Sequence, residues 1–597
     1  MSDELTQAPD LPHHFYWFNT QQPLSLLDDL TGYVVLLYFW RGTSINCQHV
    51  QPTMHYLEQR FAERSFLIIG VHAASFEAEQ DPDHVQEAIR RFGVRHPVVI
   101  DEDNELWDAY GCVAWPYFAL IDSGGCLRFQ GAGEPERDRM AGAIEFLLDD
   151  AAAAGEEPYM ELALDEYEPQ IRLAGLAFPS GIAVDEDKGR LWIADTRHHR
   201  VVAIGLQDSK LQAVVGTGWP GAADGSLEVA TFFEPTALTV VDSDVFVADT
   251  GNHLLRRIDF EAQRVETVLG TGRPVIDTMA GGTGTDQPLN SPLGLATDGE
   301  SLYVAMSGSH QIWRVDLATK SAEVLAGSGE TGQCDGLARD ASLSQPGGLA
   351  ISGTQLAFVD SGASSLRCVN LASQEVHTLV DGDMQFPSAL AWHGDDLLIA
   401  DTFHDKIRRW RKEGVLDTLA VEVHRPTALC VVGDSLFIAD AGSHRVLRLG
   451  LADCVVAEVS IADLPAGRSA FNTDYEHAHE VTLPPMAEVT LRIPMDLGEA
   501  TVLQPGTSPS LFTANVEGYP LLIDGTLTPD TEDGWFMVRG LATGTEGEGM
   551  MRLRLNYVTC EEPGQVCHMH ERRIDLPVKL EADTENCADV LVVPGAS

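Results

Sequence analysis

Basic residues are scarce in this chain. Lysine and arginine together number 39 against 90 aspartates and glutamates, which gives a formal net charge of −51 at pH 7. A field of that sign repels polyanions and anionic lipid surfaces beyond the range of local contacts. We therefore expect neither a nucleic acid nor a membrane as a partner, and we interpret the charge as a solubility surface.

Long apolar runs and cysteines are scarce too. No segment reaches 18 uninterrupted apolar residues, and the N-terminus, MSDELTQAPDLPHHFYW, lacks a basic stretch followed by an apolar one. The 10 cysteines in 597 residues are irregularly spaced and too few for the disulfide framework of a secreted protein. These absences predict a cytoplasmic protein with mostly free thiols, and no motif indicates a cofactor.

The chain is long enough for several domains, and its first 150 residues alternate apolar strands with helical patterns. The strands are VVLLYFW after Tyr33, SFLIIGVH, HPVVID, and YFALIDSGGCLRF, which Gly124-Gly125 divides into a hairpin. Helices are expected over 47–63, 83–92, 104–110 and 136–150. The order β-α-β-α-β-β-α resembles thioredoxin, so we predict a thioredoxin-like α/β domain over residues 1–150.

The turn after the first strand carries the candidate chemistry, in the sequence RGTSINCQHVQP. Thioredoxins kink the following helix with a proline five residues beyond the second cysteine of their C-x-x-C pair. Pro52 has that distance from Cys47, so the resemblance places Ser44 at the nucleophile position. It also places Pro116, after Trp115, at the cis-proline that faces the active site.

Dithiol exchange requires a thiolate at a helix N-terminus and a second thiol that resolves the mixed disulfide. A serine hydroxyl cannot take the first role, so we favour a buried, structural Cys47. Two alternatives stay open. One is a peroxidase site that resembles peroxiredoxins, with Ser44, Cys47 and Arg128 as the assisting arginine; the other is a monothiol or regulatory site at Cys47.

A second pattern repeats six times: a proline, an apolar strand, a turn, a second strand that ends in Asp, and a third strand. The repeats begin at Pro179, Pro235, Pro292, Pro346, Pro387 and Pro426, and Met306 replaces Asp in the third. Repeated units of about four strands bury their faces by stacking, which predicts a six-bladed β-propeller over residues 170–463. The copies, such as FPSGIAVDEDKGRLWIADTRHHRVVAI, resemble NHL repeats.

The repeated Asp residues, and the His residues four positions beyond, could suggest a ring of metal ligands. We favour a structural role, because a group needed in every blade serves the blade and short Asp side chains accept amide hydrogen bonds in tight turns. No metal is expected there. Loops that differ between blades, such as GTGRPVIDTMAGGTGTDQPLNS before the third repeat, are better binding candidates.

The remaining chain predicts two connectors, over 151–169 and 464–480, and an immunoglobulin-like β-sandwich over 481–597. Cys560 and Cys567 flank EEPGQV in a predicted hairpin, where facing strand positions could bring them together as a reversible redox pair. Two unlinked thiols are the alternative. A zinc set with His568 and His570 is disfavoured, because in an extended strand these two side chains point to one face and Cys567 to the other.

The three-domain order resembles the NHL repeat-containing protein 2 group, whose biochemical activity the resemblance does not specify. We predict a cytoplasmic scaffold in which the propeller binds a protein or peptide. The alternative is a thiol-dependent redox enzyme that uses Cys47 with another thiol.

Overall fold

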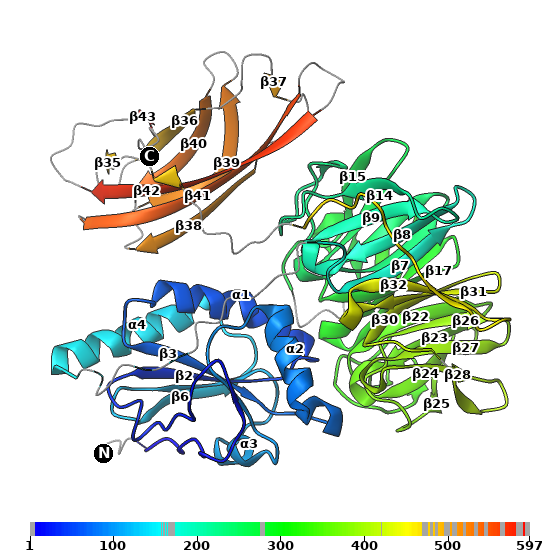
Figure 1. The fold of residues 1–597 in the computed structure, drawn as a ribbon, viewed down its shortest axis with the longest axis horizontal. Helices are drawn as coiled ribbons and strands as arrows, with labels where there is room; N and C mark the ends of the chain where they lie inside the picture. The colour runs from blue at the N-terminus through cyan, green and yellow to red at the C-terminus, as the bar shows by residue number, and fades with distance from the viewer. Residues whose placement is uncertain are drawn as a thin grey trace.

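The computed structural model contains an α/β domain, a ring of small sheets and a C-terminal group of strands (Figure 1). It describes residues 6–156, 158, 162, 164, 174–274, 281–419 and 421–467, and beyond residue 475 the backbone of strands β34 to β43. In this described part, no helix has the length and apolar character needed to cross a membrane.

The N-terminal domain is thioredoxin-like, as the sequence predicts. Its sheet has the strand order β1-β4-β3-β2-β5-β6, in which β3 pairs in parallel with β2 and with β4, while β5 pairs antiparallel with β2. The strands are β1 (Trp17–Phe18), β2 (Val34–Trp40), β3 (Phe66–His72), β4 (Val98–Ile100), β5 (Tyr117–Ile121) and β6 (Leu127–Ala132). The helices are α1 (Ile45–Arg60), η1 (Glu77–Gln80), α2 (Pro82–Phe92), α3 (Glu105–Ala109) and α4 (Arg137–Ala154).

The continuous apolar run of β2 is explained by burial on both faces of the sheet. Val34, Leu36 and Tyr38 pack with side chains of α1, α2 and α4, whereas Val35 and Leu37 pack with the N-terminal segment and α3. Every residue of β2 is buried. A central strand covered on both faces needs no polar alternation, which is why the period-two signal is absent here.

The second region is a propeller of six antiparallel sheets. Blade one contains β7 (Pro179–Asp185), β8 (Arg190–Asp195), β9 (Arg200–Gly205) and β10 (Leu211–Val215); blade two contains β12 (Pro235–Val241), β13 (Asp244–Asp249), β14 (Leu254–Asp259) and β15 (Arg264–Leu269). Blade three contains β17 (Pro292–Thr297), β18 (Ser301–Met306), β19 (Gln311–Asp316) and β20 (Ser321–Ala326); blade four contains β22 (Pro346–Ser352), β23 (Gln355–Asp360), β24 (Ser365–Asn370) and β25 (Glu375–Val380). Blade five contains β26 (Ala389–His393), β27 (Asp396–Asp401), β28 (Lys406–Trp410) and β29 (Leu416–Leu419); blade six contains β30 (Pro426–Val432), β31 (Ser435–Asp440), β32 (Arg445–Gly450) and β33 (Val456–Glu458).

The short strands β11 (Gly225–Ser226), β16 (Gly282–Thr283) and β21 (Gly336–Leu337) extend the outer edges of blades two to four. The first strand of each blade is innermost, because β7, β12, β17, β22, β26 and β30 pack against one another around the ring. Blade three forms normally although it lacks the repeated Asp: Met306 is 1% exposed and packs in an apolar cluster with Leu295 and Trp313.

The repeated Asp and His are structural, as predicted. Each Asp carboxylate accepts the backbone N–H two residues before its blade's proline, at 2.7 Å for Asp195, Asp249 and Asp360. A one-turn 3-10 helix follows, and it ends at a residue with positive φ: His199, His253, His310, Ser364, Asp405 or His444. In all six turns, the side chain of that last residue accepts a backbone N–H from the start of the next blade.

A row of hydroxyls also joins the blades. The residue after the Asp, or after Met306 in blade three, donates its hydroxyl to the carbonyl of the next blade's proline. These residues are Thr196, Thr250, Ser307, Ser361 and Thr402. Blade six has Ala441 at this position. There the ring closes differently, because the Thr427 hydroxyl donates to the carbonyl of Pro179 at 2.8 Å.

The C-terminal region consists of β-strands, shown in orange to red in Figure 1. They are β34 (Glu476–His477), β35 (Val481–Leu483), β36 (Glu488–Pro494), β37 (Val502–Leu503), β38 (Ser510–Glu517), β39 (Leu521–Asp530), β40 (Trp535–Ala542), β41 (Gly547–Cys560), β42 (Cys567–Leu580) and β43 (Asp589–Leu591). The immunoglobulin-like sandwich stays a prediction. The expected connectors fall largely outside the described residues, and α4 continues four residues beyond the expected domain end.

Candidate functional site

The S-x-x-C turn lies at the N-terminus of α1, as the proline spacing predicts. Ser44 is the N-cap, and its hydroxyl accepts the backbone N–H of Cys47 at 3.4 Å. Cys47 is 1% exposed, and the Trp115-Pro116 bond is cis. Burial raises the pKa of the Cys47 thiol to about 11, although the hydrogen bond to Ser44 and the charge of Arg41 lower it. The thiol is therefore neutral near pH 7 and a weak nucleophile.

The candidate arginine of a peroxidase site lies elsewhere. Arg128 is on β6, where its neighbours pair with Leu120 and Ile121 at the far end of β5 from Pro116, and it forms an ion pair with Asp122 at 3.0 Å. At about 3.4 Å per strand residue, this places it more than 10 Å from the cis-proline. The peroxidase alternative thus lacks its arginine, because the hairpin register holds Arg128 away from Cys47.

The active-site edge of the thioredoxin-like domain docks onto the propeller. Each residue just before a blade proline has a φ between 46° and 54°, a conformation uncommon for residues other than glycine. We call these the collar residues: Phe178, Glu234, Ser291, Gln345, Phe386 and Arg425. Their N–H groups make the bonds to the turn-ending residues described above.

Four collar side chains contact the thioredoxin-like domain. Gln345 accepts the N–H of Ile45, the first residue of α1, at 2.9 Å. Arg425 forms an ion pair with Glu87 of α2 at 2.9 Å, and Phe386 stacks with Phe76 before η1 at a centroid distance of 6.2 Å. These contacts place the propeller over the start of α1, the side from which a substrate would approach Cys47.

The fourth contact is a polar chain across the domains. The Ser291 hydroxyl bonds to His49 Nε2 at 2.5 Å, and His49 Nδ1 contacts Glu134 at 2.7 Å. Hydroxyl, imidazole and carboxylate follow in the order of a serine-hydrolase triad. However, Ser291 is 0% exposed, so no substrate carbonyl can reach its oxygen. The chain is a docking contact and not a nucleophilic site.

Two family models match this sequence: a thioredoxin-like model over residues 32–127 and an NHL-repeat model over residues 176–204. NHL repeat-containing protein 2 of Homo sapiens is 29% identical over 519 residues, which cover 76% of this chain and 71% of that protein. The chain is therefore similar to NHL repeat-containing protein 2 over most of its length.

Two further similarities extend this comparison. The protein SUPPRESSOR OF QUENCHING 1, chloroplastic, of Arabidopsis thaliana is 32% identical over 461 residues, which cover 74% of this chain and 41% of that protein. Among solved structures, virginiamycin B lyase from Staphylococcus aureus aligns with a TM-score of 0.33 and 14% identity, over 49% of this chain and 88% of the lyase.

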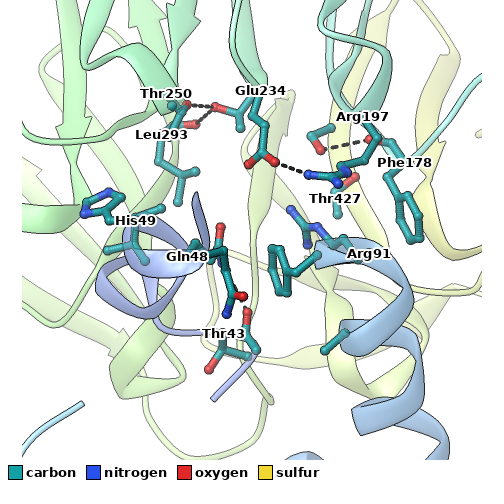
Figure 2. Close-up of a pocket in the computed structure, with 18 of the residues that line it drawn as sticks. Thr43, Gln48, His49, Arg91, Phe178, Arg197, Glu234, Thr250, Leu293 and Thr427 are labelled. Atoms are coloured by element: carbon teal, nitrogen blue, oxygen red, sulfur yellow. Dashed lines mark hydrogen bonds and ion pairs between the residues drawn. The ribbon is translucent and has the colours of Figure 1, made fainter. Parts of the chain in front are cut away.

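A cavity of about 530 Å³ lies between the thioredoxin-like domain and the propeller. Every blade contributes to its lining either the collar residue or the second residue of the innermost strand, so the cavity sits over the propeller axis. Figure 2 shows Thr43, Gln48, His49 and Arg91 of the thioredoxin-like domain facing Phe178, Glu234, Leu293 and Thr427 of the propeller. A cavity of this size falls within the range of small-molecule sites.

The S-x-x-C turn and the six blades could be predicted from the sequence, but this cavity could not. The loop suggested as a binding candidate does contribute, through Gly272 and Pro274. The repeats contain a weak signal: the position before each proline varies among Phe, Glu, Ser, Gln and Arg, whereas the proline after it is constant. Variation at one fixed repeat position indicates a role outside the repeat itself.

Proposed function

We propose that this chain is a cytoplasmic binding scaffold in which the thioredoxin-like domain is docked in place and the propeller recognises a protein or peptide. The observation that carries the proposal is the Gln345–Ile45 hydrogen bond, which closes the front of a turn whose one thiol is buried. A thiol-disulfide enzyme needs its thiolate accessible to the partner disulfide. The partner would bind on the propeller face opposite the collar, where the hairpins between first and second strands differ among blades.

Thiol reactivity tests the scaffold proposal. Native alkylation at pH 7.5, followed by mass mapping, should modify exposed Cys334 and Cys454 and leave Cys47 unmodified. Insulin-disulfide reduction and peroxide consumption should stay at the level of the reductant alone. Alkylation of Cys47 at a rate similar to that of Cys334, or turnover that a Cys47→Ser variant abolishes, would contradict the proposal.

Partner binding needs its own experiment. Proteins captured on the full chain can be mapped by hydrogen–deuterium exchange of the complex. We expect protection in the hairpins of the uncovered propeller face, such as residues 186–189 and 242–243. Protection confined to the thioredoxin-like domain would show that the propeller is not the recognition surface.

A second candidate, thiol-dependent redox activity, is favoured by one observation in the C-terminal region. The backbone register of β41 and β42 pairs Cys560 directly with Cys567. Facing positions in an antiparallel pair bring Cβ atoms to about 4.5–5.5 Å, close to disulfide geometry. Mass mapping after treatment with diamide should reveal a Cys560–Cys567 bond that dithiothreitol reverses. Failure to form that bond under oxidant removes the pair as a redox centre.

A further inference from the structure

The charged side chains that line the cavity between the domains are not all paired. Each of its carboxylates has a polar or charged partner within the protein. The pairs are Glu87 with Arg425, Glu234 with Arg197, Glu134 with His49, and Glu79 with Thr43, Ser75 and Arg41. Among the described residues of the lining, Arg91 is the cation that forms neither a hydrogen bond nor an ion pair.

Arg91 is in the last turn of α2, and its guanidinium points into the cavity toward Glu234 and Arg197 (Figure 2). Its Nε is buried without a hydrogen-bond partner. Burial lowers the pKa of Arg91, and the charge of Arg197 adds to this, while Glu234 opposes it. The guanidinium is partly exposed and lies 5.2 Å from the centroid of the Phe92 ring, but no carboxylate among the described residues pairs with it. An anion bound in the cavity would supply that missing partner.

The rest of the lining is suited to an apolar body. Phe178 and Phe233 contribute aromatic rings from the propeller, and Leu293 adds an aliphatic side chain. Small-molecule sites typically combine such apolar walls with a few polar groups that fix orientation. The single free guanidinium provides that orienting group, because its planar fork matches a carboxylate or phosphate.

We propose that the cavity between the thioredoxin-like domain and the propeller binds a small organic anion, whose carboxylate or phosphate pairs with Arg91 while its apolar part packs among Phe178, Phe233 and Leu293. The site is assembled from both domains. Ligand binding therefore stabilises the docked arrangement, since a ligand that binds both parts adds its binding free energy to their association.

Three matched probes test this proposal by isothermal titration of the full chain: 2-naphthoate, 2-naphthyl phosphate and neutral 2-naphthamide. We expect saturable binding of at least one anion and at least tenfold weaker binding of the amide. The stronger of the two anions identifies whether the native ligand carries a carboxylate or a phosphate. No saturable binding of either anion up to millimolar concentration, or equal binding of all three probes, would overturn the proposal.

Matched variants test whether the Arg91 guanidinium binds the anionic group of the probe. Arg91→Met should weaken anion binding at least tenfold and leave amide binding unchanged, whereas Arg91→Lys should retain part of the anion affinity. The control is Arg90→Met, one residue earlier on α2, because Arg90 is exposed and bonds to Gln86. Equal anion affinities for Arg91→Met and Arg90→Met would overturn the assignment. Melting temperatures show whether each variant is folded. The anion-binding result does not depend on whether the propeller also binds a protein.

Discussion

Two positions recur in every blade and have opposite roles. The Asp at the end of the second strand is nearly constant, and it faces inward to bind the backbone of its own blade. The collar residue before the proline differs from blade to blade, and it faces the thioredoxin-like domain or the cavity. The nearly constant position stabilises each blade, whereas the variable position in the same repeat makes the contacts that only one place in the ring requires.

Blade four offers the strongest test of the constant position. Asp360 is fully buried between Arg367, at 2.8 Å, and the N–H of Ser344. Asp360→Ala removes the buried one of the two carboxylates that pair with Arg367 and leaves the Ser344 N–H without an acceptor. We therefore expect a loss of about 3 kcal/mol in unfolding free energy, measured by urea denaturation.

Asp335→Ala is the matched control for that measurement. Asp335 pairs with the same Arg367 at 2.8 Å, but its side chain is 40% exposed. Water screens the ion pair of a partly exposed carboxylate, so we expect Asp335→Ala to lower the unfolding free energy by about 1 kcal/mol or less. Equal losses for the two variants would mean that burial does not distinguish the two carboxylates.

The turn-ending histidines make the constant positions sensitive to pH. Burial, together with nearby His49, lowers the pKa of His253 to about 3, whereas an unfolded histidine titrates near 6.5. Between pH 3 and pH 6.5 the unfolded chain binds more protons than the folded chain. The contribution of neutral His253 to the unfolding free energy is therefore complete above pH 6.5, and it falls by about 1.4 kcal/mol per pH unit below that.

The variant His253→Asn isolates this effect, because asparagine tolerates positive φ and does not titrate. The stability of the wild type relative to this variant should fall between pH 6.5 and 4 in urea titrations. The control His377→Asn, at an exposed histidine of β25, should follow the wild type. If the two variants behave alike, His253 is not held neutral.

Ring closure gives a smaller expected effect. Thr427→Val removes the hydroxyl that donates to the Pro179 carbonyl, where Ala441 replaces the hydroxyl residue found in the other blades. Leaving that carbonyl without its donor should cost about 1–2 kcal/mol in unfolding free energy. Thr418→Val, at an exposed position of β29, should cost almost nothing. Equal losses of unfolding free energy for the two variants would mean that the packing of β30 on β7 closes the ring without this hydrogen bond.

Much of the fold could be predicted because it depends on periodic signals. The buried apolar run of β2 extends over seven residues, and the proline-to-Asp pattern recurs in six repeats. The site could not be predicted in the same way. The distance of Arg128 from Cys47 could not be predicted, because the hairpin register decides which end of β6 lies near Pro116. Arg91 carried no signal at all, since its lack of a partner depends on how α2 docks against a propeller far along the chain.

The variable position can be tested at a single amide. Ile45 is the first residue of α1, where an N–H has no acceptor within the helix, and Gln345 supplies one from the propeller. Gln345→Ala should therefore speed hydrogen exchange at Ile45 by about twofold to tenfold, which corresponds to a net hydrogen bond of about 0.5–1.5 kcal/mol. Gln333→Ala, which removes an exposed bond to Asp381, serves as the control. Unchanged exchange at Ile45 would mean that the other collar contacts keep α1 covered without Gln345, and the closure of the S-x-x-C turn would then be a property of the whole collar.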